Sequence, residues 1–359
     1  MGKGYVMATI DLELMWGFNK ALVERPWIGR SPSFRRYVRN MGKARYVARA
    51  LLEATEELDF PLTWAIVGHL VLERCKRSCG RAHPDMPRPH VASRLDWYAF
   101  DPCSDLARAP LWYGRDIVEA VLDSPVEHEI ACHSFSHVDF SMCDRPVAEA
   151  EIRACRSLLK EHLGIRPVSF VFPFDRVGHL DLLARYGFKA FRAPRKSSLW
   201  PLNDPERLKG FVMSRLEEPL TSRLRLPPPI GFPKKIGALV EIPNTGLLYK
   251  PVEESLIILL SRLSKALLLV CRKGLLLHVY THLHNLAQGH AYLWAFKKFL
   301  ELVKEFEEQG LLCVLVMRDA VKLLNRRSSE KPLVRDCRPG RMDIDSADIA
   351  RGTVPRLHG

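Results

Sequence analysis

The sequence lacks an apolar run long enough to cross a bilayer. Its most apolar stretch, residues 256–270, is interrupted by Arg262 and Lys265, and it is shorter than the roughly 20 apolar residues that a transmembrane helix needs. Residues 1–10 also contain no long apolar segment that ends in a small-residue cleavage site, as a secretory signal would. We therefore expect no transmembrane segment, a core helix at residues 256–270 and a cytoplasmic protein.

Cysteine is too thinly spread for a small disulfide scaffold. The nine cysteines among 359 residues lack the dense, paired spacing of such scaffolds, so we expect mostly reduced thiols. One group, Cys75, Cys79 and Cys103 with His83, has side chains that suit zinc, although its spacing fits no standard zinc knuckle. Zinc binding by this group is the less favoured alternative.

Acidic residues are too few to balance the basic ones. The chain has 41 acidic residues and 54 Lys and Arg residues, a net charge of +13, which favours nucleic acid, an anionic membrane face or a phosphate-bearing substrate. The cations are scattered, and the sequence contains no helix-turn-helix, zinc-finger or aromatic-platform pattern. We therefore exclude a nucleic-acid module and favour a solvated basic surface, with a phosphate-bearing substrate left open.

The main pattern in the sequence is an alternation of short apolar runs with segments of helical periodicity. The 47% apolar content suffices for a sizeable core, and a helical period at residues 43–58 separates the first two runs. The expected strands are residues 5–10, 60–67, 129–132, 168–172, 188–192, 239–243, 275–281 and 311–316. Such alternation indicates parallel strands with crossover helices, and about seven or eight units in one chain favour a closed β/α barrel over an open sheet.

Two loops and a tail depart from this alternation. Residues 72–105 contain Cys, His, Pro and Trp without a helical period, and residues 195–233 are rich in proline. Both are expected to be rim loops that shape a substrate cleft. Because large apolar residues become rare at the C-terminus, we expect a catalytic barrel over residues 1–325 and a flexible tail over residues 326–359.

The most informative segment carries His133 and His137, four residues apart after a short apolar run. If the turn after that run is helical, both imidazoles project from one face and can hold one metal ion. Near the N-terminus, Asp11 and Glu13 are two residues apart and lie on the same side of an extended backbone. We expect Glu13, His133 and His137 to bind a divalent metal and Asp11 to take a proton from water. An ordinary hydrogen-bonded histidine pair is the alternative.

Further polar residues stand at or beyond the ends of expected strands, where the active sites of β/α barrels lie. His282 is the favoured acid for the leaving amine, and His278 and His284 share its parity in the same segment. A core role for His278 is at least as plausible as a catalytic one. Asp175 is expected to hold the catalytic Asp or His in place, and Arg192 to pair with the catalytic aspartate. For both, an ordinary loop salt bridge is the alternative.

Approximately over residues 5–324, the chain resembles the polysaccharide deacetylase superfamily, the NodB-homology hydrolases. Thr9-Ile-Asp11-Leu-Glu13 is similar to the first family motif, whose leading Asp acts as base and whose following acid binds metal. His133-Ser-Phe-Ser-His137 matches the second, metal-binding motif. Phe172-Pro-Phe-Asp175-Arg176, with Arg192, resembles the third motif, and residues 277–282 resemble the final one, which carries the acid.

The resemblance implies an α/β fold, a distorted (β/α)7-type barrel, and a hydrolase of carbon–nitrogen bonds other than peptide bonds. It also implies a divalent metal, zinc first, with cobalt or nickel as other candidates. Further segments resemble a subgroup of the superfamily with long loops. The chain departs from the family at three points: Asp11-Leu-Glu13 replaces an adjacent Asp-Asp, Val171 stands where a basic residue is expected, and no Asp-x-Trp motif is evident.

The leading functional hypothesis is therefore N-deacetylation of an N-acetylated sugar or sugar conjugate, phosphate-bearing conjugates included. The first alternative is a metal-independent hydrolase of a cyclic amide or ureide, because some relatives hydrolyse amides without a metal. The second alternative is a non-catalytic carbohydrate- or phosphate-binding barrel.

Overall fold

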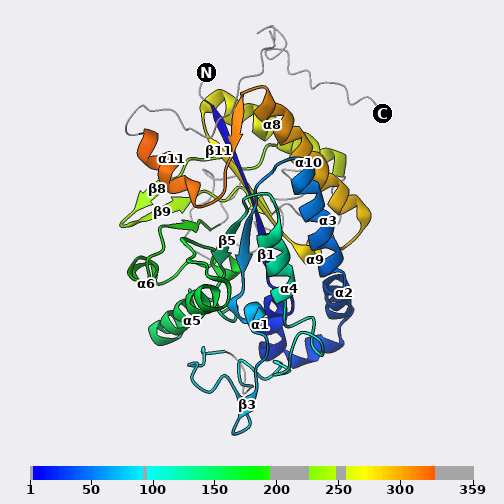
Figure 1. Cartoon of the computed structure of the whole chain (residues 1–359), viewed down its shortest axis with the longest axis vertical. Helices are drawn as coiled ribbons and strands as arrows, with labels where there is room; N and C mark the ends of the chain where they lie inside the picture. The colour runs from blue at the N-terminus through cyan, green and yellow to red at the C-terminus, as the bar shows by residue number, and fades with distance from the viewer. Residues whose placement is uncertain (1–2, 92–94, 195–225, 248–255, 328–359) are drawn as a thin grey trace.

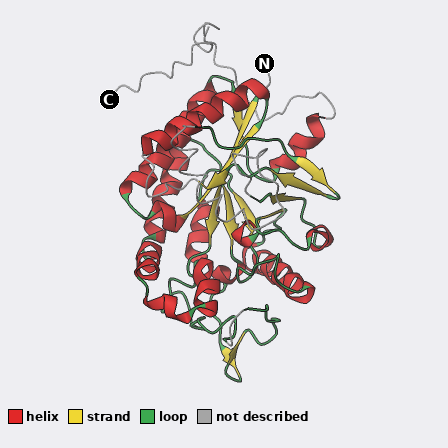
Figure 2. Cartoon of the chain, turned by 180° about the vertical axis from the view of Figure 1, so that it is seen from behind, coloured by secondary structure: helices red, strands yellow, loops and turns green. Residues whose placement is uncertain are grey.

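The strands form one mainly parallel sheet in the centre of the molecule, with helices around it (Figures 1 and 2). The computed structural model describes residues 3–91, 95–194, 226–247 and 256–327. Two strands lie outside the main parallel order: β8 (Lys234–Ile236) is antiparallel to β9, and β12 (Leu312–Val314) is a further parallel partner of β1. The other strands, in spatial order, are β10 (Gly246–Leu247), β11 (Leu276–His282), β1 (Gly4–Leu12), β2 (Thr63–Ile66), β5 (Glu129–Cys132), β6 (Ser169–Phe170), β7 (Ala190–Arg192) and β9 (Leu239–Ile242).

The sheet closes through one short bend of the chain. β9 pairs with β7 at one end of the strand order, and β10 pairs with β11 at the other end. Only residues 243–245 separate β9 from β10, and the Thr245 N–H donates to the His278 carbonyl (2.9 Å). With β9 and β10 taken as one strand, seven parallel strands surround the interior in the described part of the chain. This confirms the predicted distorted (β/α)7-type fold.

Helices cover the outside of the sheet, with α8, α10 and α3 along one side and α5 and α6 toward the other (Figure 1). The expected core helix is confirmed as α8. The helices are α1 (Trp16–Glu24), α2 (Pro32–Met41), α3 (Ala44–Glu57), α4 (Arg115–Asp123), α5 (Arg145–Leu163), α6 (Leu180–Arg185), α8 (Leu256–Lys273), α9 (Leu283–Leu286), α10 (His290–Glu308) and α11 (Asp319–Arg327), with 3-10 turns η1 (Pro26–Arg30), η2 (Gly68–Val71) and η3 (Pro173–Asp175). No helix within the described ranges has both the length and the apolar content that crossing a bilayer requires.

The two-residue period of the strands decides which side chains enter the barrel. In β1, Val6, Ala8 and Ile10 belong to the core between sheet and helices, whereas Met7 belongs to a separate inner cluster. The other strands supply small or branched side chains to that inner cluster, among them Ala65, Ala131, Val171, Ala190 and Ile242. Small side chains let the strands curve around a narrow interior.

Toward the carboxyl ends of the strands, the inward-facing positions are occupied by polar side chains. Asp11 and Glu13 follow Met7 on the odd positions of β1 and beyond, and His133 follows Ala131 after β5. Arg192 follows Ala190 in β7, and His282 has the parity of Leu276 in β11. The pattern that buries the inner cluster therefore also directs these polar groups to one end of the barrel.

The expected loops and tail are described only in part. The described residues of the segment 72–105, which exclude 92–94, contain no helix. Their regular structure is the hairpin of β3 (Arg77–Ser78) and β4 (Arg81–Ala82). Most of the expected loop at 195–233 and residues 328–359 of the expected tail lie outside the described residues. The division into a barrel at 1–325 and a tail at 326–359 stays a prediction.

One half-buried histidine makes the fold sensitive to acid. His128 Nδ1 accepts a hydrogen bond from the Leu62 backbone N–H (3.0 Å), and burial lowers the pKa of His128 to about 4. An unfolded chain, with an ordinary histidine pKa of about 6.5, binds more protons between pH ~6.5 and ~4, so the folded state loses stability as the pH falls through that window.

The Oδ1 of an asparagine at position 128 can accept the same hydrogen bond but does not titrate. We therefore expect His128→Asn to lose about 1–2 kcal/mol less stability than the wild type between neutral pH and pH ~5. Urea unfolding at a series of pH values measures this. His162→Asn, at an exposed position of α5, is the control and should keep the wild-type pH dependence. An unaltered acid-induced loss in His128→Asn would contradict the assignment.

Candidate active site

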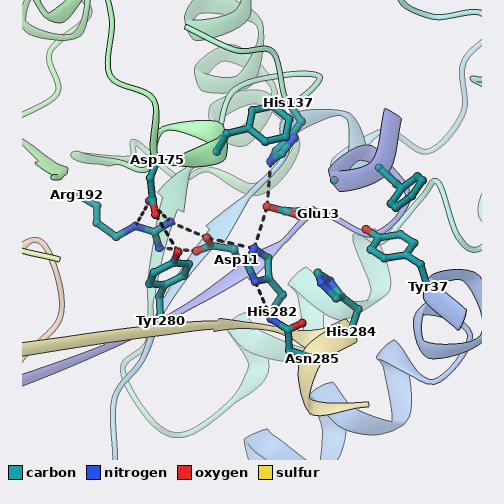
Figure 3. A pocket seen from close by; sticks show the side chains of 13 residues that line it. Asp11, Glu13, Tyr37, His137, Asp175, Arg192, Tyr280, His282, His284 and Asn285 are labelled. Carbon is teal, nitrogen blue, oxygen red and sulfur yellow. Dashed lines mark hydrogen bonds and ion pairs between the residues drawn. The ribbon is translucent and has the colours of Figure 1, made fainter. Parts of the chain in front are cut away.

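A cavity of about 400 Å³ lies at the carboxyl ends of the barrel strands, where β/α barrels carry their sites. Most of the site residues predicted from the sequence line it (Figure 3). His133 does not line the cavity but contacts Glu13, which does. His278 does not line the cavity either. The lining residues are Asp11, Glu13, Gly17, Phe18, Tyr37, His137, Phe174, Asp175, Arg192, Tyr280, His282, His284 and Asn285.

Glu13, directly after β1, is the centre of a cluster of imidazoles. Its Oε1 lies 3.1 Å from His133 Nε2, 2.9 Å from His137 Nε2 and 3.3 Å from His282 Nε2. Burial by itself raises the pKa of Glu13, but the surrounding histidines outweigh it and hold the pKa well below the usual range. The carboxylate is therefore ionised, and three nitrogens converge on one of its oxygens.

His133 and His137 meet through a loop, and not through the helical turn that was one way to bring them together. Residues 133–137 contain no helix, and Ser134 and His137 both have a φ of 62°, in the left-handed region that interrupts a right-handed helix. Ser134 Oγ accepts the His137 backbone N–H (2.9 Å) and tightens the turn. Buried Glu151 of α5 accepts the N–H and Oγ–H of Ser136 at 2.7 and 2.6 Å, which anchors the loop to the outer core.

The donor set of this cluster fits a divalent metal ion. His133 Nδ1 lies 2.7 Å from the Val171 carbonyl oxygen, so Nδ1–H donates there and the Nε2 lone pair faces Glu13. Ligand atoms around a tetrahedral zinc ion lie about 3.3 Å apart, close to the 3.1 and 2.9 Å that separate Glu13 Oε1 from His133 and His137. An overlapping group, Asp11, Glu13 and His282, also has its donor atoms within 4.8 Å of one another.

Arg192 of β7 holds two carboxylates inside the barrel. Its two terminal nitrogens donate to the two oxygens of Asp11 at 2.8 and 2.7 Å, which is the pairing expected from the sequence. Nη2 also donates to Asp175 Oδ1 (3.0 Å), and Tyr280 donates to Asp175 Oδ2 (2.8 Å). Burial alone would raise the pKa of Asp11, but Arg192 holds it below the usual range. Asp175 thus supports Asp11 through Arg192.

His282 ends β11 beside both acidic side chains. Its Nε2 lies 3.7 Å from Asp11 Oδ2 and 3.3 Å from Glu13 Oε1. Burial by itself lowers the pKa of His282, but Glu13 and Asp11 outweigh it and raise the pKa. The Asn285 amide lies 3.2 Å from Nδ1, and because an amide offers both a donor and an acceptor, it can satisfy Nδ1 of neutral or protonated His282. His282 can therefore give up a proton from Nε2 and stay in place.

The other two histidines of this segment differ from His282. His278 is buried, with Nε2 2.8 Å from Thr9 Oγ1 and Nδ1 3.1 Å from the Pro243 carbonyl oxygen, and burial lowers its pKa to about 3. His284 packs on Tyr37, with ring centroids 4.8 Å apart, and burial lowers its pKa to about 3. The position of His278 suits the core role, and both rings are neutral at pH 7.

Several lining residues carry little signal in the sequence. Tyr280 has the same parity in β11 as His278 and His282, so the strand period could have found it. Tyr37 comes from α2 and Phe174 from η3. No local pattern brings these two side chains to the carboxyl ends of the strands.

Residues 41–191 match a family model described as Polysaccharide deacetylase. The matched range contains His133, His137 and Asp175, and it leaves out Asp11 and Glu13, which the barrel brings to the same cavity. Among curated proteins, none matches this chain significantly.

Three solved structures share the fold along nearly the whole chain. A "putative polysaccharide deacetylase" from Mycobacterium smegmatis is 16% identical, covers 93% of this chain and 95% of its own, and has a TM-score of 0.57. A "probable Polysaccharide deacetylase" from Pseudomonas aeruginosa PAO1 is 13% identical, covers 92% and 93%, and has a TM-score of 0.55. The Puue allantoinase is 13% identical, covers 92% and 93%, and has a TM-score of 0.53.

The family match covers residues 41–191, less than half of the chain, and the likeness to the solved structures extends the shared fold to nearly all of it. Residues 41–191 are therefore similar to the polysaccharide deacetylases, which confirms the resemblance predicted from the motifs.

Gly17 leaves the space that Glu13 occupies. Gly17 lies in the first turn of α1, and a Cβ there would lie 2.1 Å from Glu13 Oε2 and 2.9 Å from the Tyr37 hydroxyl, so the carboxylate would have to move and the hydroxyl would have to shift slightly. Alanine also favours a helix interior over glycine by up to ~1 kcal/mol. We expect Gly17→Ala to keep or raise the melting temperature but to weaken zinc binding roughly 10- to 100-fold, measured by calorimetric titration.

Gly29→Ala is the matched control, because its Cβ would meet only Leu22 Cδ2 at 3.6 Å. It should leave the zinc affinity unchanged. A folded Gly17→Ala protein with wild-type zinc affinity would show that Glu13 does not hold the ion.

Proposed function

We propose that the chain is a divalent-metal-dependent deacetylase that removes the N-acetyl group of a sugar or sugar conjugate. The observation that supports this most is the convergence of three imidazole nitrogens within 3.3 Å of Glu13 Oε1. Asp11, ionised beside Arg192, lies next to this cluster. Zinc is the expected ion, with cobalt or nickel as alternatives, because imidazole and carboxylate ligands suit all three.

Each step of amide hydrolysis has a candidate residue. A divalent ion held by Glu13, His133 and His137 supplies Lewis acidity to the amide carbonyl and lowers the pKa of water. Asp11 takes the proton of the attacking water at a carboxylate oxygen, and Arg192 keeps that carboxylate ionised and oriented. His282, whose Nε2 lies 3.7 Å from Asp11 Oδ2, gives a proton to the nitrogen of the leaving amine.

The lining of the cavity supports a sugar as substrate. Phe18, Tyr37, Phe174 and Tyr280 present aromatic side chains to the cavity, and such side chains pack against the apolar faces of sugar rings. A volume of about 400 Å³ lies within the roughly 300–1,000 Å³ of small-molecule sites. The cavity can therefore take a sugar ring with its acetamido group next to Glu13.

The net charge of the chain supports a phosphate-bearing conjugate. The chain carries a net charge of +13, which favours anionic ligands. Lys20 Nζ lies 5.4 Å from the ring centroid of Phe174, which lines the cavity. Lys20 pairs with Asp139 and Glu24, and Arg176 pairs with Asp139, so a phosphate group would have to compete with these carboxylates for Lys20.

A metal-independent hydrolase of a cyclic amide or ureide is the second candidate. The fold likeness to the Puue allantoinase favours it. In addition, the His137 and His282 rings can each donate an Nε2–H to Glu13 Oε1 without an ion. A non-catalytic carbohydrate-binding barrel is less well supported, because Asp11, Glu13 and His282 together supply a base, a ligand and an acid.

Removal of the metal tests the leading proposal. We expect the purified full-length protein to release acetate from an N-acetylated sugar or sugar nucleotide, to lose this activity in a strong chelator, and to regain it with zinc, cobalt or nickel. Asp11→Asn should lower kcat about 10²- to 10⁴-fold while leaving the metal bound, because it removes the base and keeps the ligands. Acetate release and metal analysis of each variant are the measurements.

Asp181→Asn is the matched control, since Asp181 is an exposed carboxylate on α6 that pairs with Arg145. It should keep the wild-type kcat. Hydrolysis of a cyclic amide that resists the chelator would favour the second candidate. If no substrate of a panel of N-acetylated sugars, sugar nucleotides and cyclic amides were hydrolysed in an Asp11-dependent way, the non-catalytic barrel would remain.

A further inference from the structure

A second cluster of metal-ligating side chains lies outside the cavity. It is formed where the segment between η2 and α4 leaves the barrel, near α1 and the β3–β4 hairpin (Figure 1). His69, Cys75, His83 and Asp101 each bring one donor atom to within 4.8 Å of the others. His69 and Asp101 are buried, and Cys75 and His83 are half-buried. None of the four lines the proposed active site.

Four of the six separations among these donor atoms are close to those around a tetrahedral zinc ion, and the other two are at most 4.8 Å. His69 Nε2 and His83 Nε2 lie 3.1 Å apart, and they lie 3.1 and 2.8 Å from Asp101 Oδ2. Cys75 Sγ lies 3.6 Å from the same oxygen. A tetrahedral zinc ion with bonds of about 2.0 Å to N or O and 2.3 Å to S separates its ligand atoms by about 3.3 Å, or by about 3.5 Å where one is sulfur.

Hydrogen bonds alone account poorly for this arrangement. If both rings donated an N–H to Asp101 Oδ2, two positively polarised hydrogens would face each other between nitrogens only 3.1 Å apart. A cation among the donors lets each ring offer a lone pair instead. One carboxylate and one thiolate with two neutral imidazoles would also balance the charge of a divalent ion, as a buried site requires.

The surrounding residues fix the two anionic ligands. Asp101 Oδ1 accepts the Cys103 backbone N–H (2.8 Å), so Oδ2 is left to the cluster. The Tyr113 hydroxyl lies 3.2 Å from Cys75 Sγ and accepts the Ser104 N–H (3.0 Å), so its own hydrogen can point to the sulfur. Such contacts orient ligands around metal ions.

The cluster differs from the zinc group considered from the sequence. Cys75 and His83 belong to both, but Cys79 is exposed and is not in the cluster. His69 and Asp101 take the places of Cys79 and Cys103. His69 comes from η2 and Asp101 from the far end of the segment, so only folding brings them together.

The cluster also contacts the loop that carries His133 and His137. The His69 N–H donates to the Phe135 carbonyl oxygen (2.9 Å). The Phe135 ring packs against His69 and His83, with centroids 5.6 and 5.2 Å apart. An ion in the cluster would therefore join the segment after η2 to this loop. A segment with so little regular structure gains most from such a link, because metal binding adds directly to folding stability.

We propose that His69, Cys75, His83 and Asp101 form a closed structural zinc site, separate from the cluster around Glu13. Four protein ligands leave no open position, so this site does no chemistry on substrate. It connects the segment of residues 72–105 to the barrel and to the loop after β5. The proposal does not depend on the metal proposed for the active site, because the two sites share no ligand.

Sulfur ligation distinguishes the two sites, since Glu13, His133, His137 and His282 offer only nitrogen and oxygen. We expect the full-length protein loaded with cobalt(II) to show the near-ultraviolet absorption of a thiolate–cobalt bond. Cys75→Ser should lose this absorption together with one equivalent of metal. Cys79→Ser, which removes an exposed cysteine of the same segment, is the matched control and should keep both.

His133→Ala should keep the thiolate–cobalt absorption, because it alters only the cluster around Glu13. If His133→Ala loses its metal but wild-type activity persists, the proposed function fails while the structural site stands. Cobalt-loaded wild-type protein without the absorption, or Cys75→Ser with the absorption intact, would overturn the structural site. If Cys75→Ser does not fold, X-ray absorption of the zinc-loaded wild type decides: a zinc–sulfur shell is expected, and nitrogen and oxygen neighbours alone would overturn the proposal.

Discussion

The buried ion pair between Arg192 and Asp11 governs the arrangement of the barrel interior. Both side chains are about 2% exposed, and a charge left without its partner at such a position costs about 3–5 kcal/mol. Arg192 also binds Asp175, which accepts the Tyr280 hydroxyl. Each charge therefore has a partner from a different element, and β1, β7, β11 and η3 are held in register at the end of the barrel that forms the cavity.

Glu13 shows how the chain brings a second carboxylate to the cavity although it lacks an adjacent pair of aspartates. In an extended strand, neighbouring residues face opposite sides, and Leu12 accordingly packs in the outer core. Glu13, one residue further along, returns to the inner side, and its longer side chain reaches the imidazoles of the loop after β5. That loop is fixed from outside by Glu151 and by the N–H groups of η2.

The strand period made much of the fold predictable from the sequence. The expected strand at residues 129–132 coincides with β5, and the expected strand at 275–281 differs from β11 by one residue at each end. The same parity places Asp11, Glu13 and Arg192 inside the barrel. The conformation of residues 133–137 was left open by the sequence. Ser134 and His137 adopt left-handed backbone angles, which tertiary hydrogen bonds stabilise and which no local pattern of residue types predicts.

The sequence by itself determined the alternation of strands and helices, the parity that sends polar side chains inward, and the family resemblance of the motifs, since all three depend on residues near one another in the chain. Tertiary structure alone decided which distant groups meet. The approach of Tyr37 and His284 in the cavity, the space left by Gly17, and the gathering of His69 with Asp101 depend on barrel closure and loop packing. Those contacts join segments whose separation along the chain leaves no periodic signal.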